Sequence, residues 1–261
     1  MFPSVWMPLV ALCAGAALAT FVIEFLTTRR SAASTACFTY SGDEMIKRMT
    51  LLARREGTSV SDFRAYWSGC HAQLALCMNG IAKYTQNRVD KTLWKSAGGS
   101  GCFDVDGIVE LCFESDELMS KAQDSAVGSR YIPEDEPNFL RGWTLCVVDH
   151  EDEAKEPAGV KVILVAALKA GVSRTEFEQV IVESDKGQST PATTSFNWTN
   201  KSARRERLWA EPVAPTVLVA LWFKNIAEAH DGFRIESSLV QRIDGLADRA
   251  AAYLINPLVV R

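Results

Sequence analysis

The sequence predicts an α+β protein in which two copies of one strand-helix-strand-strand-helix-strand unit form a barrel within a single chain. The chain has 261 residues, enough for about one and a half to two domains. Hydrophobic residues make up 48% of it and charged residues 23%, the mixture of an ordinary globular protein. A strand, a glycine turn and an amphipathic helix recur in both halves, and the interval from Gly57 to Phe63 equals that from Gly171 to Phe177.

The first copy contains all the elements of the unit in order. Its strands are bounded by turn residues, and its first helix carries a capping serine and an apolar stripe that is expected to face a sheet. The expected elements are a strand at 46–55, a helix from Ser59 or Ser61 to Gly80, strands at 81–94 and 104–114, a helix at 116–126, an irregular stretch through Pro133 and Pro137, and a strand at 143–148. This order is the split unit of ferredoxin-like folds.

The second copy follows a charged, proline-terminated linker at 150–157. It begins with a strand at 160–169 and a helix around Phe177, and it closes with a strand at 255–260. The strands of both copies are apolar on both faces, so the two sheets are expected to bury each other. We therefore expect two ferredoxin-like domains, at 45–150 and 159–261, that form an intramolecular barrel.

The first 44 residues differ from the rest. An apolar run at 5–26, broken by Pro8 and Glu24 and followed by an arginine pair, is long enough to span a bilayer. The positive-inside rule would then leave the body of the protein in the cytoplasm. Two interpretations of this segment are open. It is either a membrane anchor or an extension without function that precedes a natural start at Met45. A cleaved signal peptide fits less well, because no Lys or Arg precedes the run.

Charge and cysteine content narrow the range of partners. Lys and Arg number 28 against 32 Asp and Glu, so the formal net charge is −4 and no nucleic-acid partner is expected. The seven cysteines are an odd count without metal-ligand spacing, so we expect neither a disulfide framework nor a metal site. A reducing compartment, the cytoplasm, fits best. Assembly of the chain into a homodimer is left open.

The first helix carries the candidate catalytic residue. Trp67 and His71 lie four residues apart and therefore on adjacent turns, with Tyr66 beside them. An imidazole held against a sheet in an aromatic pocket can act as a general acid or base near neutral pH. The alternative is a histidine that simply packs in the core.

This helix resembles the first helix of the EthD family, in which the pattern F-x-x-Y-W-x-x-x-H-[AG]-x-L occurs. The matching residues are Phe63, Tyr66, Trp67, His71, Ala72 and Leu74, together with Tyr84, Gln86 and Asn87 on the second strand and the segment 106–113 on the third. The resemblance covers about 45–150. It implies the dimeric α/β barrel fold, a pocket between sheet and helices, and acid-base chemistry at His71 without a cofactor.

Three polar residues on the strands are further candidates. Asp106 and Glu110 are four residues apart on one strand and are expected to share a face. Glu110 either orients His71 or pairs with Arg48 on the neighbouring strand. Asn87 either donates a hydrogen bond to a substrate carbonyl or satisfies the backbone.

The second copy lacks this polar set. At the aligned positions Tyr66 becomes Val180, Trp67 becomes Ile181, His71 becomes Asp185 and Glu110 becomes Ala220. The second copy is therefore expected to be a structural partner, with one functional pocket in the first copy. The basic cluster at 204–207 is expected to be a solvated surface.

The sequence thus predicts a cofactor-independent lyase, cyclase or isomerase that acts on a small aromatic or polyketide-like compound. His71, Glu110 and Tyr66 are the expected catalytic residues, and Phe63, Trp67, Asn87 and Asp106 the expected substrate-binding residues. Two alternatives remain: an oxidoreductase or accessory protein in ether or aromatic degradation, and a non-catalytic barrel that binds a small ligand.

Overall fold

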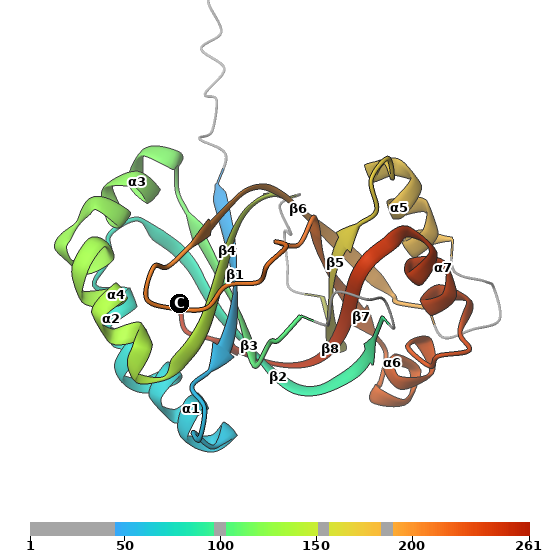
Figure 1. The fold of residues 1–261 in the computed structure, drawn as a ribbon, viewed down its shortest axis with the longest axis horizontal. Helices are drawn as coiled ribbons and strands as arrows, with labels where there is room; N and C mark the ends of the chain where they lie inside the picture. Colours follow the sequence, from blue (N-terminus) through green and yellow to red (C-terminus); the bar gives the residue numbers. More distant parts are fainter. Residues whose placement is uncertain (1–44, 97–102, 151–156, 184–189) are drawn as a thin grey trace, which may run out of the picture. The chain divides into compact units, whose positions relative to one another are not determined.

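The computed structural model describes residues 45–96, 103–150, 157–183 and 190–261. Eight strands form a closed antiparallel barrel in the order β1-β3-β2-β8-β5-β7-β6-β4 (Figure 1). The strands are β1 Ile46–Arg54, β2 Ile81–Lys95, β3 Gly107–Phe113, β4 Leu140–His150, β5 Val160–Leu168, β6 Thr193–Arg204, β7 Val217–Phe223 and β8 Ala247–Val259. The helices are α1 Val60–Tyr66, α2 Ala72–Leu76, α3 Asp116–Asp124, α4 Ile132–Asp135, α5 Arg174–Val182, α6 Ile226–Gly232 and α7 Ser238–Leu246.

Each half of the barrel is one ferredoxin-like unit, so the predicted fold class is confirmed. Strands β1 to β4 belong to the first unit and β5 to β8 to the second, and the pairs β2-β8 and β4-β6 join them. Helices α1 to α4 cover one side of the barrel and α5 to α7 the other (Figure 1). Each unit has an apolar cluster between its sheet and its helices. A third apolar cluster, which includes Met49, Ile163 and Tyr253, lies between the two sheets. It fills the barrel interior with side chains from both units.

The stretch between α3 and β4 is helical, and the expectation of irregular structure there was wrong. A π-helix at Val127–Tyr131 leads into α4, and a 3-10 helix at Glu136–Asn138 follows it. Pro133 and Pro137 each lie in the first turn of a short helical segment, directly after residues that are helical themselves. The prolines therefore mark the points where one type of helix passes into the next.

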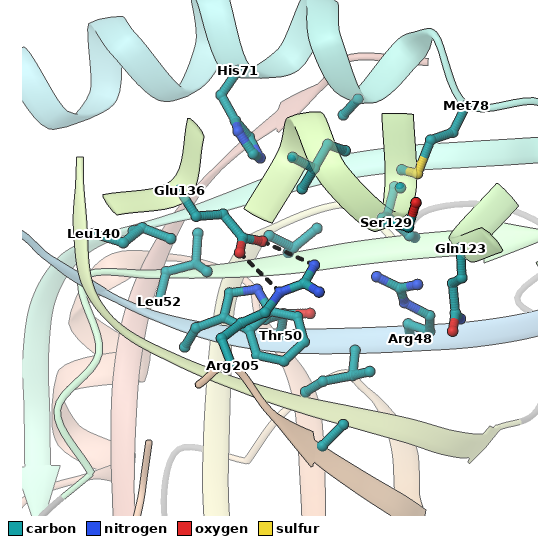
Figure 2. A pocket seen from close by; sticks show the side chains of 18 of the residues that line it. Arg48, Thr50, Leu52, His71, Met78, Gln123, Ser129, Glu136, Leu140 and Arg205 are labelled. Atoms are coloured by element: carbon teal, nitrogen blue, oxygen red, sulfur yellow. Dashed lines mark hydrogen bonds and ion pairs between the residues drawn. The ribbon is translucent and has the colours of Figure 1, made fainter. Parts of the chain in front are cut away.

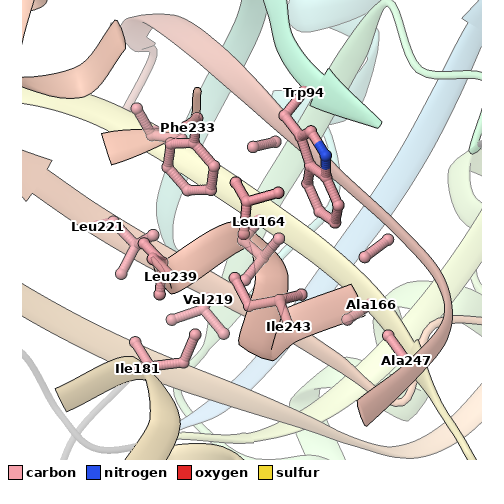
Figure 3. Packing of buried hydrophobic residues seen from close by; sticks show 14 of the residues in the cluster. Trp94, Leu164, Ala166, Ile181, Val219, Leu221, Phe233, Leu239, Ile243 and Ala247 are labelled. Carbon is pink, nitrogen blue, oxygen red and sulfur yellow. The ribbon is translucent and has the colours of Figure 1, made fainter. Parts of the chain in front are cut away.

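The two units differ in what lies between sheet and helices. The strand registers pair Arg48 with Leu111 and, in the second unit, Val162 with Leu221, so Val162 occupies the place of Arg48. In the second unit this layer is a continuous apolar cluster that includes Leu164 (Figure 3). In the first unit it contains a cavity. The aligned residue Asp185 lies outside the described residues.

None of the helices in the described part of the chain combines the length and the hydrophobicity needed to cross a membrane. The segment 1–44 lies outside the described residues, so the anchor and the functionless extension both stay predictions.

Gly107 at the start of β3 is required by the packing of Trp67. A Cβ atom at this position would lie 2.5 Å from the indole Cζ3 atom, and the indole itself is fully buried. We expect Gly107→Ala to lower the free energy of unfolding by roughly 1–3 kcal/mol, because the ring has no space to move. Urea unfolding measures this change.

Gly245 provides the matched control. It lies in α7, and a Cβ atom added there would have no neighbouring heavy atom within 4 Å, so Gly245→Ala should be neutral or slightly stabilising. Equal stability of the Gly107→Ala variant and the wild type would contradict the close packing of Trp67.

Candidate active site

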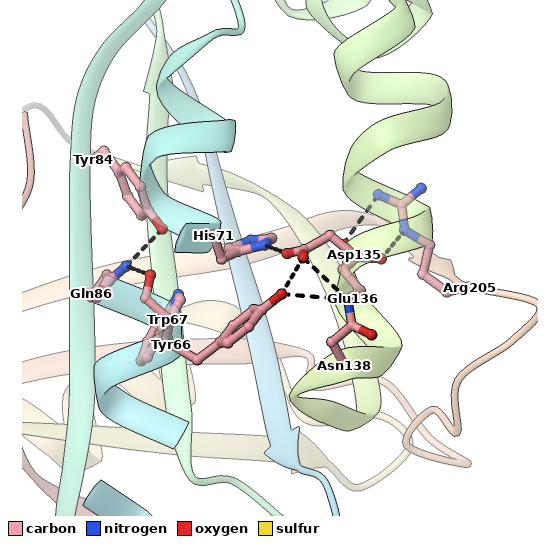
Figure 4. A network of polar contacts seen from close by, with 9 residues as sticks. All are labelled: Tyr66, Trp67, His71, Tyr84, Gln86, Asp135, Glu136, Asn138 and Arg205. Carbon is pink, nitrogen blue, oxygen red and sulfur yellow. Dashed lines mark hydrogen bonds and ion pairs between the residues drawn. The ribbon is translucent and has the colours of Figure 1, made fainter. Parts of the chain in front are cut away.

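The first helix of the site is held in place at both ends. Ser59 accepts a hydrogen bond from the backbone N–H of Asp62 at 3.0 Å and so caps α1. The helix then widens into a π-helix at Trp67–His71, a feature often found at functional sites. Gln86 on β2 donates to the carbonyl oxygen of Trp67 at 2.9 Å and thereby ties the π-helix to the sheet (Figure 4).

His71 and Asp135 form a hydrogen-bonded pair between the first helix and α4. Nδ1 of His71 lies 2.8 Å from Oδ2 of Asp135 (Figure 4). The hydroxyl of Tyr66 donates to the other carboxylate oxygen at 2.5 Å, and Asn138 donates to both groups at 3.3 Å. The hydrogen bond with His71 is the largest cause that lowers the pKa of Asp135, so this carboxylate is ionised at neutral pH.

The hydrogen bond with Asp135 determines which ring nitrogen of His71 can accept a proton. An ionised carboxylate only accepts hydrogen bonds, so Nδ1 of the neutral imidazole carries the proton. Nε2 is then the basic nitrogen, and Asp135 also stabilises the imidazolium that forms when Nε2 takes up a proton. The hydrogen bond to Asp135 raises the pKa of Tyr66, so its hydroxyl stays protonated and keeps donating.

A cavity of about 300 Å³ lies beside His71, between the sheet and the helices of the first unit (Figure 2). Its walls are mainly apolar and come from β1, β3, β4 and α4, among them Leu52, Leu111, Ile132 and Trp143. Polar and charged side chains enter it from β1, from α3, from the helical stretch that contains Glu136 and from β6. A cavity of this size and lining suits a small, largely apolar molecule.

An ion pair between the two units closes one side of the cavity. Nε and Nη2 of Arg205 lie 2.9 and 3.3 Å from the carboxylate oxygens of Glu136 (Figure 2). The guanidinium also lies over the ring of Trp143, 4.6 Å from its centroid. Burial raises the pKa of Glu136. The expectation that the cluster at 204–207 is only a solvated surface was therefore wrong for Arg205.

The predicted aromatic residues lie beneath His71 and do not line this cavity. Phe63 and Trp67 are fully buried, with ring centroids 5.5 Å apart, and Phe139 stacks on Tyr66 and contacts the imidazole at 4.8 Å. Phe63 and Trp67 therefore support the helix that carries His71. The hydroxyl of Tyr66 contacts Asp135 and is not part of the cavity lining.

Glu110 does not contact His71 or Arg48, so both expected pairings were wrong. Because side chains alternate along β3, Val109 and Leu111 line the cavity and Glu110 faces the barrel interior. There its carboxylate contacts Lys47 at 3.1 Å and Lys161 at 2.8 Å.

Asn87 and Asp106 also lie away from the cavity. Asn87 donates to Glu110 at 2.8 Å and to the backbone oxygen of Ile108 at 3.2 Å, inside the barrel. Asp106 precedes β3 and accepts hydrogen bonds from Arg54. The expectation that Asp106 and Glu110 share one face of a strand was wrong, since β3 begins only at Gly107.

Four polar residues of the site were not predicted from the sequence: Arg48, Asp135, Glu136 and Arg205. The two acidic residues stand between Pro133 and Pro137. Interpreted as residues that start helices, these prolines would have placed both carboxylates on helical turns facing the sheet. Within the described ranges, no group of three or more His, Cys, Asp and Glu side chains could hold a metal ion.

The fold and the site define a dimeric α/β barrel protein whose two halves lie in one chain and whose first half carries a histidine-aspartate pair at a cavity. Residues 55–142 match the family model of the EthD domain, and this part of the chain is an EthD domain. The match begins just before α1 and ends within β4. It contains His71, Asp135 and Glu136. No curated protein sequence shows significant similarity to the chain.

Solved structures share the fold at low sequence identity. An anthrone oxidase-like protein is 8% identical with a TM-score of 0.52, and the match covers 84% of this chain and 94% of that one. A candidate monooxygenase from Lactobacillus acidophilus is 10% identical with a TM-score of 0.43, over 82% and 95% of the two chains. A candidate monooxygenase from Fusobacterium nucleatum is 11% identical with a TM-score of 0.47, over 82% and 93%. The first of these likenesses supports the barrel fold.

Proposed function

We propose that the protein is a cofactor-independent enzyme, a lyase, cyclase or isomerase, that acts on a small aromatic or polyketide-like molecule through acid-base chemistry at His71. The observation that carries this proposal is the His71 imidazole, with Nδ1 bound to Asp135 at 2.8 Å and its ring at the wall of the cavity. A histidine in this setting is oriented, has its imidazolium form stabilised and can meet a bound molecule.

The proposed step is proton transfer at a carbon next to a carbonyl group. Nε2 of His71 takes the proton, the C–H bond breaks, and its electron pair is held as an enolate. Return of the proton to another carbon gives an isomer. If the enolate carbon instead attacks a second carbonyl of the same molecule, a carbon-carbon bond closes a ring, and the resulting alkoxide takes the proton back from His71. In both cases the enzyme ends as it began.

The shape of the cavity supports a compact substrate. Its volume of about 300 Å³ lies at the lower end of the range for small-molecule sites. Apolar side chains such as Leu52, Leu111 and Leu140 can pack against a ring system, and the positions of the polar groups limit how it can be oriented.

Two other functions remain as alternatives. The anthrone oxidase-like neighbour favours an oxidative or accessory role on an aromatic molecule. The buried contact of His71 with Phe139 favours a barrel that binds a small ligand without converting it.

Deuterium exchange separates these three possibilities. The full chain would be incubated in D₂O with 1-tetralone and a set of aryl β-keto acids while dissolved oxygen is recorded. Acid-base chemistry predicts deuterium incorporation or product formation, seen by mass spectrometry, without oxygen uptake. Turnover that requires oxygen would favour the oxidative role, and ligand binding without exchange or product would favour the binding protein.

A further inference from the structure

Arg48 is a buried cation inside the cavity that forms no ion pair with any carboxylate in the described part of the chain. It lies on β1, whose residues Arg48, Thr50 and Leu52 face the cavity (Figure 2). The residue is 8% exposed, and its Nε atom has no hydrogen-bond partner among the described residues. Its guanidinium lies 5.5 Å from the ring centroid of Phe113.

The carboxylate of Glu136, whose charge acts on Arg48, is already engaged. Glu136 forms its two-point ion pair with Arg205, and Arg205 in turn repels Arg48. Burial, followed by this repulsion, lowers the pKa of Arg48 to about 10, which leaves it protonated at neutral pH. The charged residues that line the cavity are Arg48, Arg204, Arg205, Asp124 and Glu136, three cations against two anions. These five side chains give the cavity a surplus positive charge.

A buried, unpaired guanidinium is costly unless something satisfies it. The second unit avoids the cost, because Val162 occupies the equivalent position in its apolar layer. In the first unit the charge is retained at the wall of a largely apolar cavity. A bound anion would supply both the missing counter-charge and the missing hydrogen-bond acceptor.

We propose that Arg48 binds an anionic oxygen group of the substrate, so that the ligand class is a small aromatic carboxylate. This inference rests on the proposed function, because it takes the cavity beside His71 to be the substrate site. The carboxylate would lie against Arg48 on the sheet and the ring between the apolar walls, with His71 reaching it from the helix layer. The fork of a guanidinium matches the two oxygens of a carboxylate.

Two isosteric probes test the charge directly. Isothermal titration calorimetry would compare 2-naphthoate with the neutral 2-naphthamide on the wild type, Arg48→Met and Arg130→Gln. We expect the wild type to bind naphthoate roughly ten- to a hundredfold more tightly than the amide, the usual effect of hydrogen bonds to a charged group. Arg48→Met should lose this preference. Arg130→Gln, which removes a guanidinium exposed on the same unit, should keep it.

A further variant separates binding from catalysis. His71→Asn removes the proposed base but leaves Arg48 in place, so the preference for naphthoate should persist in it. Failure of the deuterium exchange together with a retained preference would overturn only the proposed reaction. Equal affinity for the two probes, failure of naphthoate to bind, or a preference that survives Arg48→Met would overturn the assignment of Arg48. If Arg48→Met does not fold, Arg48→Lys decides, because it keeps the charge without the fork and should reduce the preference.

Discussion

His71→Ala is expected to lower turnover by roughly two to four orders of magnitude, the usual contribution of a positioned proton donor or acceptor. The variant should fold, because the smaller side chain only enlarges a cavity that already exists beside it. Asp135→Asn should also lower the rate, since an amide can donate to Nδ1 and favour the wrong tautomer. Steady-state kinetics on any substrate that the wild type converts would measure both effects.

His230→Ala is the matched control, because this histidine lies on α6 in the second unit, away from the cavity. It should leave the rate unchanged. If His71 is only a core histidine, His71→Ala should instead lower the melting temperature and leave the rate nearly unaffected. That result would move the assignment to a ligand-binding barrel.

Glu110→Gln is expected to lower the free energy of unfolding by roughly 3–5 kcal/mol, the cost of removing one partner from a buried ion pair. Glu110 contacts Lys47 of its own unit and Lys161 of the other, and both lysine side chains are less than a tenth exposed. Without the carboxylate both buried lysines would lose the contact with Glu110 that offsets the cost of burying their charges. Chemical denaturation would measure the loss, and Lys161→Met in the same chain should recover part of it.

Glu117→Gln is the control, because Glu117 forms an exposed pair with Lys121 on α3. It should change stability little. An equally small effect of Glu110→Gln would show that the interior cluster does not hold the two units together.

The ion pairs of Glu110 with Lys47 and Lys161 also make the free energy of unfolding depend on pH in the acidic range. Burial alone would raise the pKa of Glu110, but Lys161 and Lys47 outweigh it and hold the pKa well below its usual value. The stabilisation is therefore full above the unfolded-state pKa of about 4.3 and is lost as the pH falls further. The Glu110→Gln variant should lack this part of the acid sensitivity, which melting curves between neutral and acidic pH would show.

The fold could be predicted from the sequence because its evidence is repeated and local. A strand, a glycine turn and a helix with Phe63 or Phe177 at the same interval occur twice, and strands that are apolar on both faces need cover on both. His71 could be placed for the same reason, since helical spacing fixes its face relative to Trp67.

The rest of the site depends on information that local patterns do not contain. When both faces of a strand are buried, alternation does not tell which face meets the helices, so Glu110 was expected to lie beside His71 or Arg48 instead of inside the barrel. Arg205 reaches the cavity only because β6 pairs with β4 across the two units. Pro133 and Pro137 mark turns more often than helix starts, which concealed Asp135 and Glu136.

The contribution of Arg205 from the second unit to the cavity of the first has a consequence for how such barrels can diverge. Two identical chains that assemble symmetrically must present two identical sites, because every residue that completes one site completes the other. A covalent link removes this restriction. One half can then hold Arg48 at a position where the other holds Val162, and the second half can stabilise and complete a site that it does not itself possess.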